Sequence, residues 1–69
     1  MEKTEKRIER IIAAKTALGY TIGELERRSD LGYATIWRIM HYFDVGTAYK
    51  HEPRKTTLKT LESVLGLDR

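Results

Sequence analysis

Apolar residues recur at helical spacing in four segments of the chain, and this periodicity is the feature that most restricts its fold. Ile8, Ile11 and Ile12, for example, lie three or four positions apart and therefore share one face of a helix. No run of alternating apolar and polar residues indicates a strand, and no internal repeat is visible. We therefore predict an all-α fold, a small bundle of four helices with a fifth as the alternative, in one domain over residues 1–69.

Glycine and capping residues mark where these helices begin and end. Gly19 and Gly66 are placed to end helices, because glycine readily adopts the left-handed backbone that often follows a helix. Thr21 and Glu24 have capping-box spacing, in which the threonine hydroxyl accepts from a backbone amide and the glutamate reaches back. Asp30 breaks the next pattern and can adopt a left-handed backbone. The helices are predicted over residues 4–18, 22–28, 33–42 and 57–65.

The same periodicity predicts the core and leaves one long connection. We expect Leu67 to fold back onto the last helix, and Val45 and Tyr49 to tether the connection over residues 44–56. The side chains predicted to face inward are Ile8, Ile11, Ile12, Leu18, Leu25, Ile36, Ile39, Met40, Phe43, Leu58, Leu61, Val64 and Leu65.

Length and composition exclude several classes of protein. The 69 residues include no cysteine, which excludes a disulfide scaffold, a cysteine zinc finger and a thiol catalyst. No apolar run is long enough to span a membrane, and the charged start MEKTEKRIER is unlike a signal peptide, so we expect a cytoplasmic, nucleoid-associated protein. So small a bundle is expected to lack a sizeable pocket, and we predict no enzymatic activity, no cofactor and no small-molecule ligand. His41, Asp44, His51 and Glu52 match no common zinc spacing, and no metal site is predicted.

Positive charge is concentrated in the middle of the chain. The net charge is +3, and residues 32–59 hold five Lys or Arg residues against two Asp or Glu residues. Such a local excess favours an anionic partner.

Residues 21–40 read TIGELERRSDLGYATIWRIM, with apolar residues where two short helices would meet. This stretch resembles the helix-turn-helix of the Xre/Cro/cI family of phage and bacterial regulators. Residues 57–66, TLKTLESVLG, resemble the helix that follows it in that family. The resemblance covers nearly the whole chain apart from residues 41–55, and it implies a lambda-repressor-like fold with the motif over about residues 21–42. The chain departs from the family in its longer loop and at Glu26 and Asp30, where a small residue and a glycine are usual.

The second motif helix carries the candidate base contacts. A protruding helix about 10–12 Å wide fits the DNA major groove, which is about 12 Å wide. Opposite its predicted buried stripe lie aromatic, small and basic residues with no acid among them, and we predict base contacts by Tyr33, Ala34, Trp37 and Arg38. The guanidinium of Arg38 can bind O6 and N7 of guanine together, although it could instead pair with Glu26 or a phosphate. Trp37 could instead contact a phosphate or sugar, or be covered by the long loop.

Hydroxyl and basic residues around this helix are the candidate phosphate contacts. They are Thr21, Thr35, His41, Lys50, Arg54 and Lys55. Free amides at the start of a helix can hold a phosphate, and the resemblance implies backbone contacts just before the last helix. Each candidate could instead have an ordinary structural role, as a helix cap, a hydroxyl bonded to its own helix or a solvated charge.

We therefore expect a sequence-specific regulator that binds double-stranded DNA, a Cro-like repressor that occludes its operator. One such helix reads only a few base pairs, so a homodimer is expected, with half-sites about 34 Å apart. One alternative is a DNA-bending excision factor. The other is a protein-binding module, either an antitoxin or an anti-regulator, with an apolar surface made by Tyr20, Trp37, Tyr42, Phe43, Val45 and Tyr49.

Overall fold

The computed structural model describes residues 3–44 and 53–67, and all regular secondary structure in these ranges is helical. Helix α1 spans Thr4–Leu18, α2 spans Ile22–Ser29, α3 spans Tyr33–Met40 and α4 spans Lys55–Val64. The predicted all-α bundle of four helices is confirmed. The last helix begins two residues earlier than predicted, and α3 ends at Met40 in a turn over residues 41–43.

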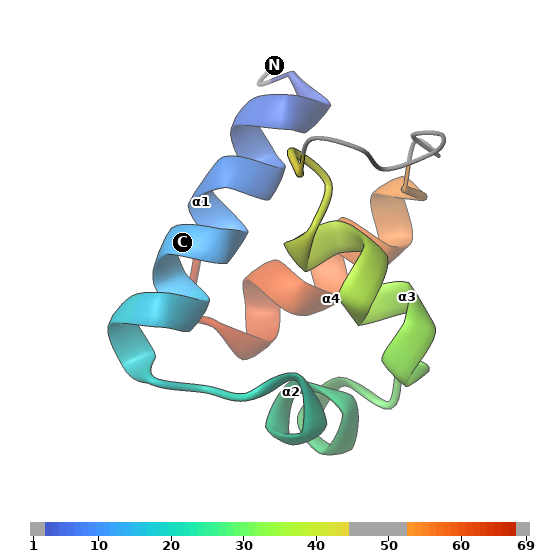
Figure 1. The fold of residues 1–69 in the computed structure, drawn as a ribbon. Coiled ribbons are helices and arrows are strands. Elements are labelled where there is room, and N and C mark those ends of the chain that lie inside the picture. The colour runs from blue at the N-terminus through green and yellow to red at the C-terminus, as the bar shows by residue number, and fades with distance from the viewer. Residues whose placement is uncertain (1–2, 45–52, 68–69) are drawn as a thin grey trace.

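Each of the first two helices packs against both of the last two. Helix α1 contacts α3 and α4, and α2 contacts the same two helices. In Figure 1, α2 is seen nearly along its axis while α3 runs across the view, so these consecutive helices cross steeply. No Cα atom of α3 lies within 8 Å of a Cα atom of α4. Helices α3 and α4 are therefore held next to each other by α1 and α2 rather than by close packing of their own backbones.

The core lies between all four helices. Its buried residues are Ile8, Ile11, Leu25, Ile36, Ile39, Leu58, Leu61 and Leu65, and none of them is more than 6% exposed. Two residues predicted to face inward do not, since Leu18 is 53% exposed and Phe43 is 42% exposed. Leu18 is the last residue of α1, and Phe43 follows the end of α3, so helical periodicity no longer places it beside Ile39. Val45 and Tyr49, the predicted tethers, lie outside the described residues.

Backbone bonds at the helix ends explain where the chain turns. Gly19 has φ 73° and Gly66 has φ 75°, the left-handed conformation that glycine adopts without strain. Beyond Gly66, the backbone N–H of Leu67 donates to the carbonyl oxygen of Glu62 at 2.7 Å. This bond folds Leu67 back against the core, as the sequence predicts.

Side chains bond to the backbone at both ends of α2. At the start of α2, Oγ1 of Thr21 accepts from the N–H of Glu24 at 3.1 Å. At its end, the Ser29 hydroxyl donates to the Leu25 carbonyl and accepts from the N–H of Leu31. Asp30 adopts φ 61° and ψ 23°, the left-handed conformation predicted for it. The two bonds of Ser29 and the left-handed backbone of Asp30 fix the direction in which the chain leaves α2 for α3.

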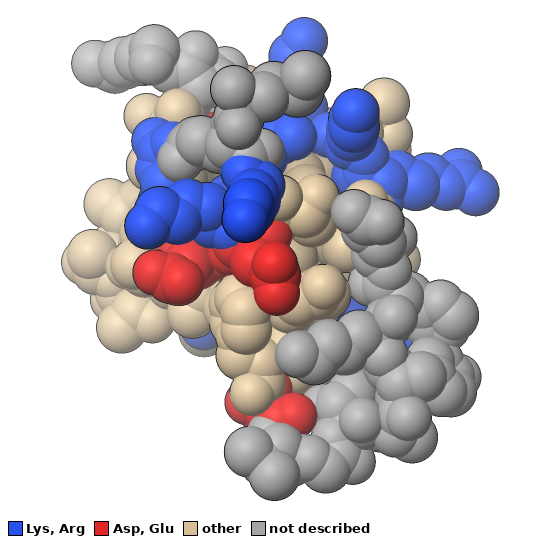
Figure 2. All heavy atoms as spheres, turned by 90° about the horizontal axis from the view of Figure 1, so that it is seen from above, with Lys and Arg blue, Asp and Glu red and all other residues tan. Residues whose placement is uncertain are grey.

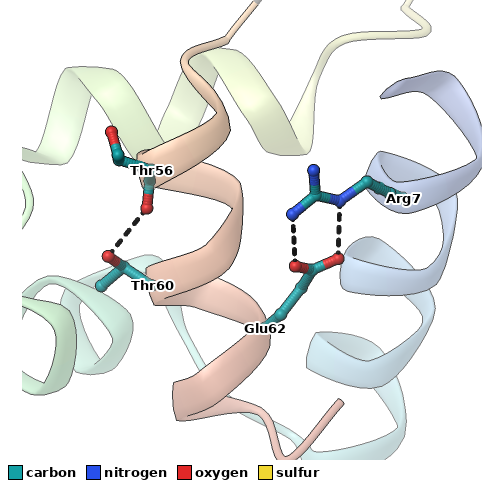
Figure 3. A network of polar contacts seen from close by, with 4 residues as sticks. All are labelled: Arg7, Thr56, Thr60 and Glu62. Carbon is teal, nitrogen blue, oxygen red and sulfur yellow. Dashed lines mark hydrogen bonds and ion pairs between the residues drawn. The ribbon is translucent and has the colours of Figure 1, made fainter. Parts of the chain in front are cut away.

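An ion pair joins the two helices that are farthest apart in the sequence. The guanidinium of Arg7 on α1 donates to the Glu62 carboxylate on α4 through Nε at 3.0 Å and a terminal nitrogen at 2.6 Å (Figure 3). On the same helix, the Thr60 hydroxyl donates to the Thr56 carbonyl at 2.9 Å. The two-point geometry fixes the relative position of α1 and α4.

Candidate nucleic-acid interface

Helix α3 has one buried face and one exposed face. Ile36 is fully buried and Ile39 is 2% exposed, whereas Tyr33 is 52% exposed and Trp37 is 42% exposed. The other two predicted base-contact residues, Ala34 and Arg38, are also exposed. The four predicted base-contact residues are therefore all on the outside of the molecule, on one helix that begins directly after the turn.

The C-terminal end of this exposed face is occupied by a polar and aromatic cluster. The rings of Trp37 and His41 stack with their centroids 4.2 Å apart and their planes at 26°. Nδ1 of His41 lies 2.5 Å from Oδ2 of Asp44, and since a carboxylate only accepts, Nδ1 is the donor. His41 is thus held by two neighbours, and Nε2 would donate to a phosphate only in an imidazolium that carries a second proton. The expectation of an acid-free face is wrong at this end, because it overlooked Asp44, three residues beyond His41.

The predicted phosphate-contact residue at the start of α2 acts as a helix cap. Oγ1 of Thr21 accepts from the N–H of Glu24, but its own O–H proton is still available to donate. The carboxylate of Glu24 lies 3.8 Å from Nε of Arg28 rather than back at the cap, so only half of the predicted capping box forms. Arg28 in turn lies over the ring of Tyr20, at 4.9 Å from its centroid.

Three predicted DNA-contact residues line one groove between α3 and α4. Thr35 and Arg38 come from α3, and Arg54 precedes α4. The groove has a volume of about 380 Å³, and its other lining residues are Leu31, Ile39, Tyr42, Pro53 and Thr57. The groove is present because α3 and α4 do not pack closely against each other. The prediction that so small a bundle would lack a sizeable pocket is therefore wrong, because it did not foresee that α3 and α4 stand apart.

Of the other two basic residues predicted to contact phosphates, the structure describes only one. Lys55 is exposed at the first residue of α4, beside the groove, whereas Lys50 lies outside the described residues. Neither Arg38 nor Arg54 makes an ion pair within the described ranges, and the alternative pairing of Arg38 with Glu26 does not form there. Glu26 is half-buried without such a partner. The two guanidinium groups are consequently available to an external anion.

Charge at the end of the molecule where the N-terminus lies is mixed. Seen from that end, Lys and Arg side chains border a smaller group of Asp and Glu side chains (Figure 2). A surface with both signs offers an anionic polymer no continuous attraction.

Aromatic residues next to the end of α3 form the apolar surface predicted for a protein partner, but only in part. The rings of Tyr42 and Phe43 meet edge to face, with centroids 5.1 Å apart, and Phe43 is exposed. Tyr20 is half-buried beneath Arg28, on another part of the molecule. Val45 and Tyr49 lie outside the described residues, so Trp37 and Phe43 are the members of the predicted protein-binding surface that the described part of the chain shows to be exposed.

Neither a metal cluster nor a membrane segment is found in the described part of the chain. No three His, Cys, Asp or Glu residues gather there, and His51 and Glu52 lie outside it. None of the described helices has the length and apolar character needed to cross a bilayer.

Comparison with known protein families, with characterised proteins and with solved structures found no match for this chain.

Proposed function

We propose that this protein is a sequence-specific regulator that binds double-stranded DNA with α3 in the major groove. The observation that carries the proposal is the exposed outer face of α3, where Tyr33, Ala34, Trp37 and Arg38 stand opposite the buried Ile36 and Ile39. The steep crossing of α2 and α3 and the resemblance of residues 21–40 to the Xre/Cro/cI motif also support it.

The side chains on this face suit the edges of base pairs. Arg38 would bind O6 and N7 of guanine through its two parallel N–H groups, an interaction worth about 1–3 kcal/mol of discrimination. Ala34 would contact a thymine methyl group, and Tyr33, at the first residue of α3, would reach a base or phosphate. Trp37, held against His41, would fill the groove beside them.

Residues at the starts of α2 and α4 would hold the sugar–phosphate backbone on either side. The hydroxyl of Thr21 and the first amides of α2 would donate to one phosphate. Arg54 and Lys55, at the start of α4, would bind another. Phosphate contacts of this kind set the position of α3 but do not themselves distinguish sequences.

A Cro-like repressor is the specific role that we propose. No described residue belongs to a second domain, and a DNA-bound domain of this kind would act by blocking polymerase at an operator. An eight-residue helix reads few base pairs, so we propose that two copies bind together, with half-sites about 34 Å apart.

Selection of bound sequences from a random pool of DNA duplexes tests this proposal directly. The expected result is a palindromic consensus whose half-sites are one helical turn apart. Recovery of no enriched sequence, together with no retention of any duplex at low ionic strength, would rule out the proposed function.

A protein-binding module is the second candidate, and the exposure of Trp37 and Phe43, 42% each, is the observation that favours it. A salt titration separates the two functions. Affinity for DNA falls steeply as salt rises, because bound phosphates must release their counterions. Affinity for a protein held through aromatic side chains would change little over the same range.

A further inference from the structure

The groove between α3 and α4 is lined by both apolar and basic residues. A DNA phosphate alone would require only the basic residues. Its apolar part is formed by Leu31, Ile39, Tyr42 and Pro53. Leu31, Tyr42 and Pro53 are half-buried and provide the accessible part of this apolar surface, whereas Ile39 is 2% exposed. A volume of about 380 Å³ lies in the range of small-molecule sites, roughly 300–1,000 Å³, and exceeds what a single phosphate group would fill.

The mouth of the same groove is positively charged. Arg38 and Arg54 are exposed and line it from opposite sides, and neither makes an ion pair within the described ranges. Thr35 and Thr57 line the same groove. Two guanidinium groups facing one space without a carboxylate partner favour an anion there.

The start of α4 adds to this preference. The first backbone bond of α4 is donated by Leu58 to Arg54, so the amides of the three preceding residues make no helical bond. Arg54 stands at the capping position and provides no side-chain acceptor for them. The positive end of the helix dipole is thus uncapped at the edge of the groove, beside Thr57.

We propose that this groove binds a small organic anion, a carboxylate attached to a planar apolar body. The carboxylate would lie between Arg38 and Arg54 and accept from Thr57, and the apolar body would cover Tyr42 and Pro53, which are partly exposed. The groove shares Arg38 with the proposed DNA-binding face, but its ligand can be tested in the absence of DNA, so the two proposals can fail separately. If both proposals hold, the anion and DNA would compete for Arg38.

A titration of the ¹⁵N-labelled full chain by NMR, without DNA, tests the site with three related probes. Benzoate carries both the charge and the planar body, benzamide carries the body alone, and acetate carries the charge alone. We expect benzoate to saturate in the millimolar range and to shift the amides of Thr35 and Thr57. Benzamide and acetate are expected to bind at least about tenfold more weakly, because each lacks one of the two interactions.

Matched variants decide whether the groove is responsible. Arg54→Gln should weaken benzoate binding at least about tenfold. Arg38→Gln provides the same test from α3 in case a change at the start of α4 affects folding. Lys59→Gln removes the same charge from a part of α4 that does not line the groove, and it should leave the affinity within about twofold. The site is excluded if benzoate does not saturate, if acetate binds equally well, or if Lys59→Gln matches the two arginine variants.

Discussion

Arg7 and Glu62 are joined by two parallel hydrogen bonds, at 3.0 Å and 2.6 Å, although 55 positions separate them in the sequence. Their side chains are only 23% and 14% exposed. The pair links the first helix directly to the last, and α1 and α4 together provide half of the buried core residues. In so small a domain, whose net stability is about 3–5 kcal/mol, losing one partner of this pair would remove a large fraction of the total.

Removing one partner of this pair should destabilise the fold. We expect Glu62→Gln to lower the free energy of unfolding by about 1–3 kcal/mol, because Arg7 would keep a partly desolvated charge with a weaker acceptor. Urea denaturation followed by circular dichroism measures the change. Glu24→Gln is the matched control, because its pair with Arg28 spans 3.8 Å and is largely exposed, and it should cost about 0.5 kcal/mol or less. If both variants lost the same free energy of unfolding, the pair between α1 and α4 would stabilise the fold no more than an exposed pair does.

A substitution at the turn should have the opposite effect. Asp30 adopts φ 61°, a conformation that costs a residue with a Cβ atom about 1 kcal/mol relative to glycine. We expect Asp30→Gly to raise the free energy of unfolding by up to about 1 kcal/mol, and Asp30→Ala to lower it. Both are measured by the same denaturation experiment, and a loss of stability in the glycine variant would contradict the argument.

The sequence predicted local structure well because helix ends are encoded locally. Gly19, Gly66 and Asp30 all adopt the left-handed backbone expected from their positions, and the buried stripe of α3 follows from its periodicity. One error in the core arises where no glycine marks a helix end. The predicted stripe of α3 extends to Phe43, but the helix ends at Met40, and such an end cannot be read from spacing alone.

Some features of the candidate site could also be predicted from the sequence, and others could not. The exposure of Trp37 and Arg38 could be predicted, because it follows from the buried positions beside them. The pairing of His41 with Asp44 was overlooked, although their separation of three residues is a local signal that could have suggested it. The groove that brings Thr57 next to Arg38 has no such signal, since it depends on the distance between α3 and α4.

The role of Arg38 can be tested by comparing specific and random DNA. If Arg38 reads a base, Arg38→Ala should weaken binding to the selected sequence by about 10- to 100-fold and binding to random duplex far less. Fluorescence anisotropy with labelled duplexes measures both affinities. Arg27→Ala is the control, because Arg27 is exposed on α2 and belongs to neither the base-contact nor the phosphate-contact set. An equal loss on both duplexes would assign Arg38 to the backbone instead of a base.

Lys55 tests the backbone contacts separately. It is exposed at the first residue of α4, where a lysine would bind a phosphate without reading a base. Lys55→Ala should therefore weaken specific and random DNA alike, and the plot of log affinity against log salt concentration should become less steep by about one unit. The slope is measured by repeating the anisotropy titration at several salt concentrations. Lys15→Ala, a change of the same charge on α1, should leave the slope as it is. An unchanged slope for Lys55→Ala would remove this residue from the phosphate contacts and would move the DNA backbone away from the start of α4.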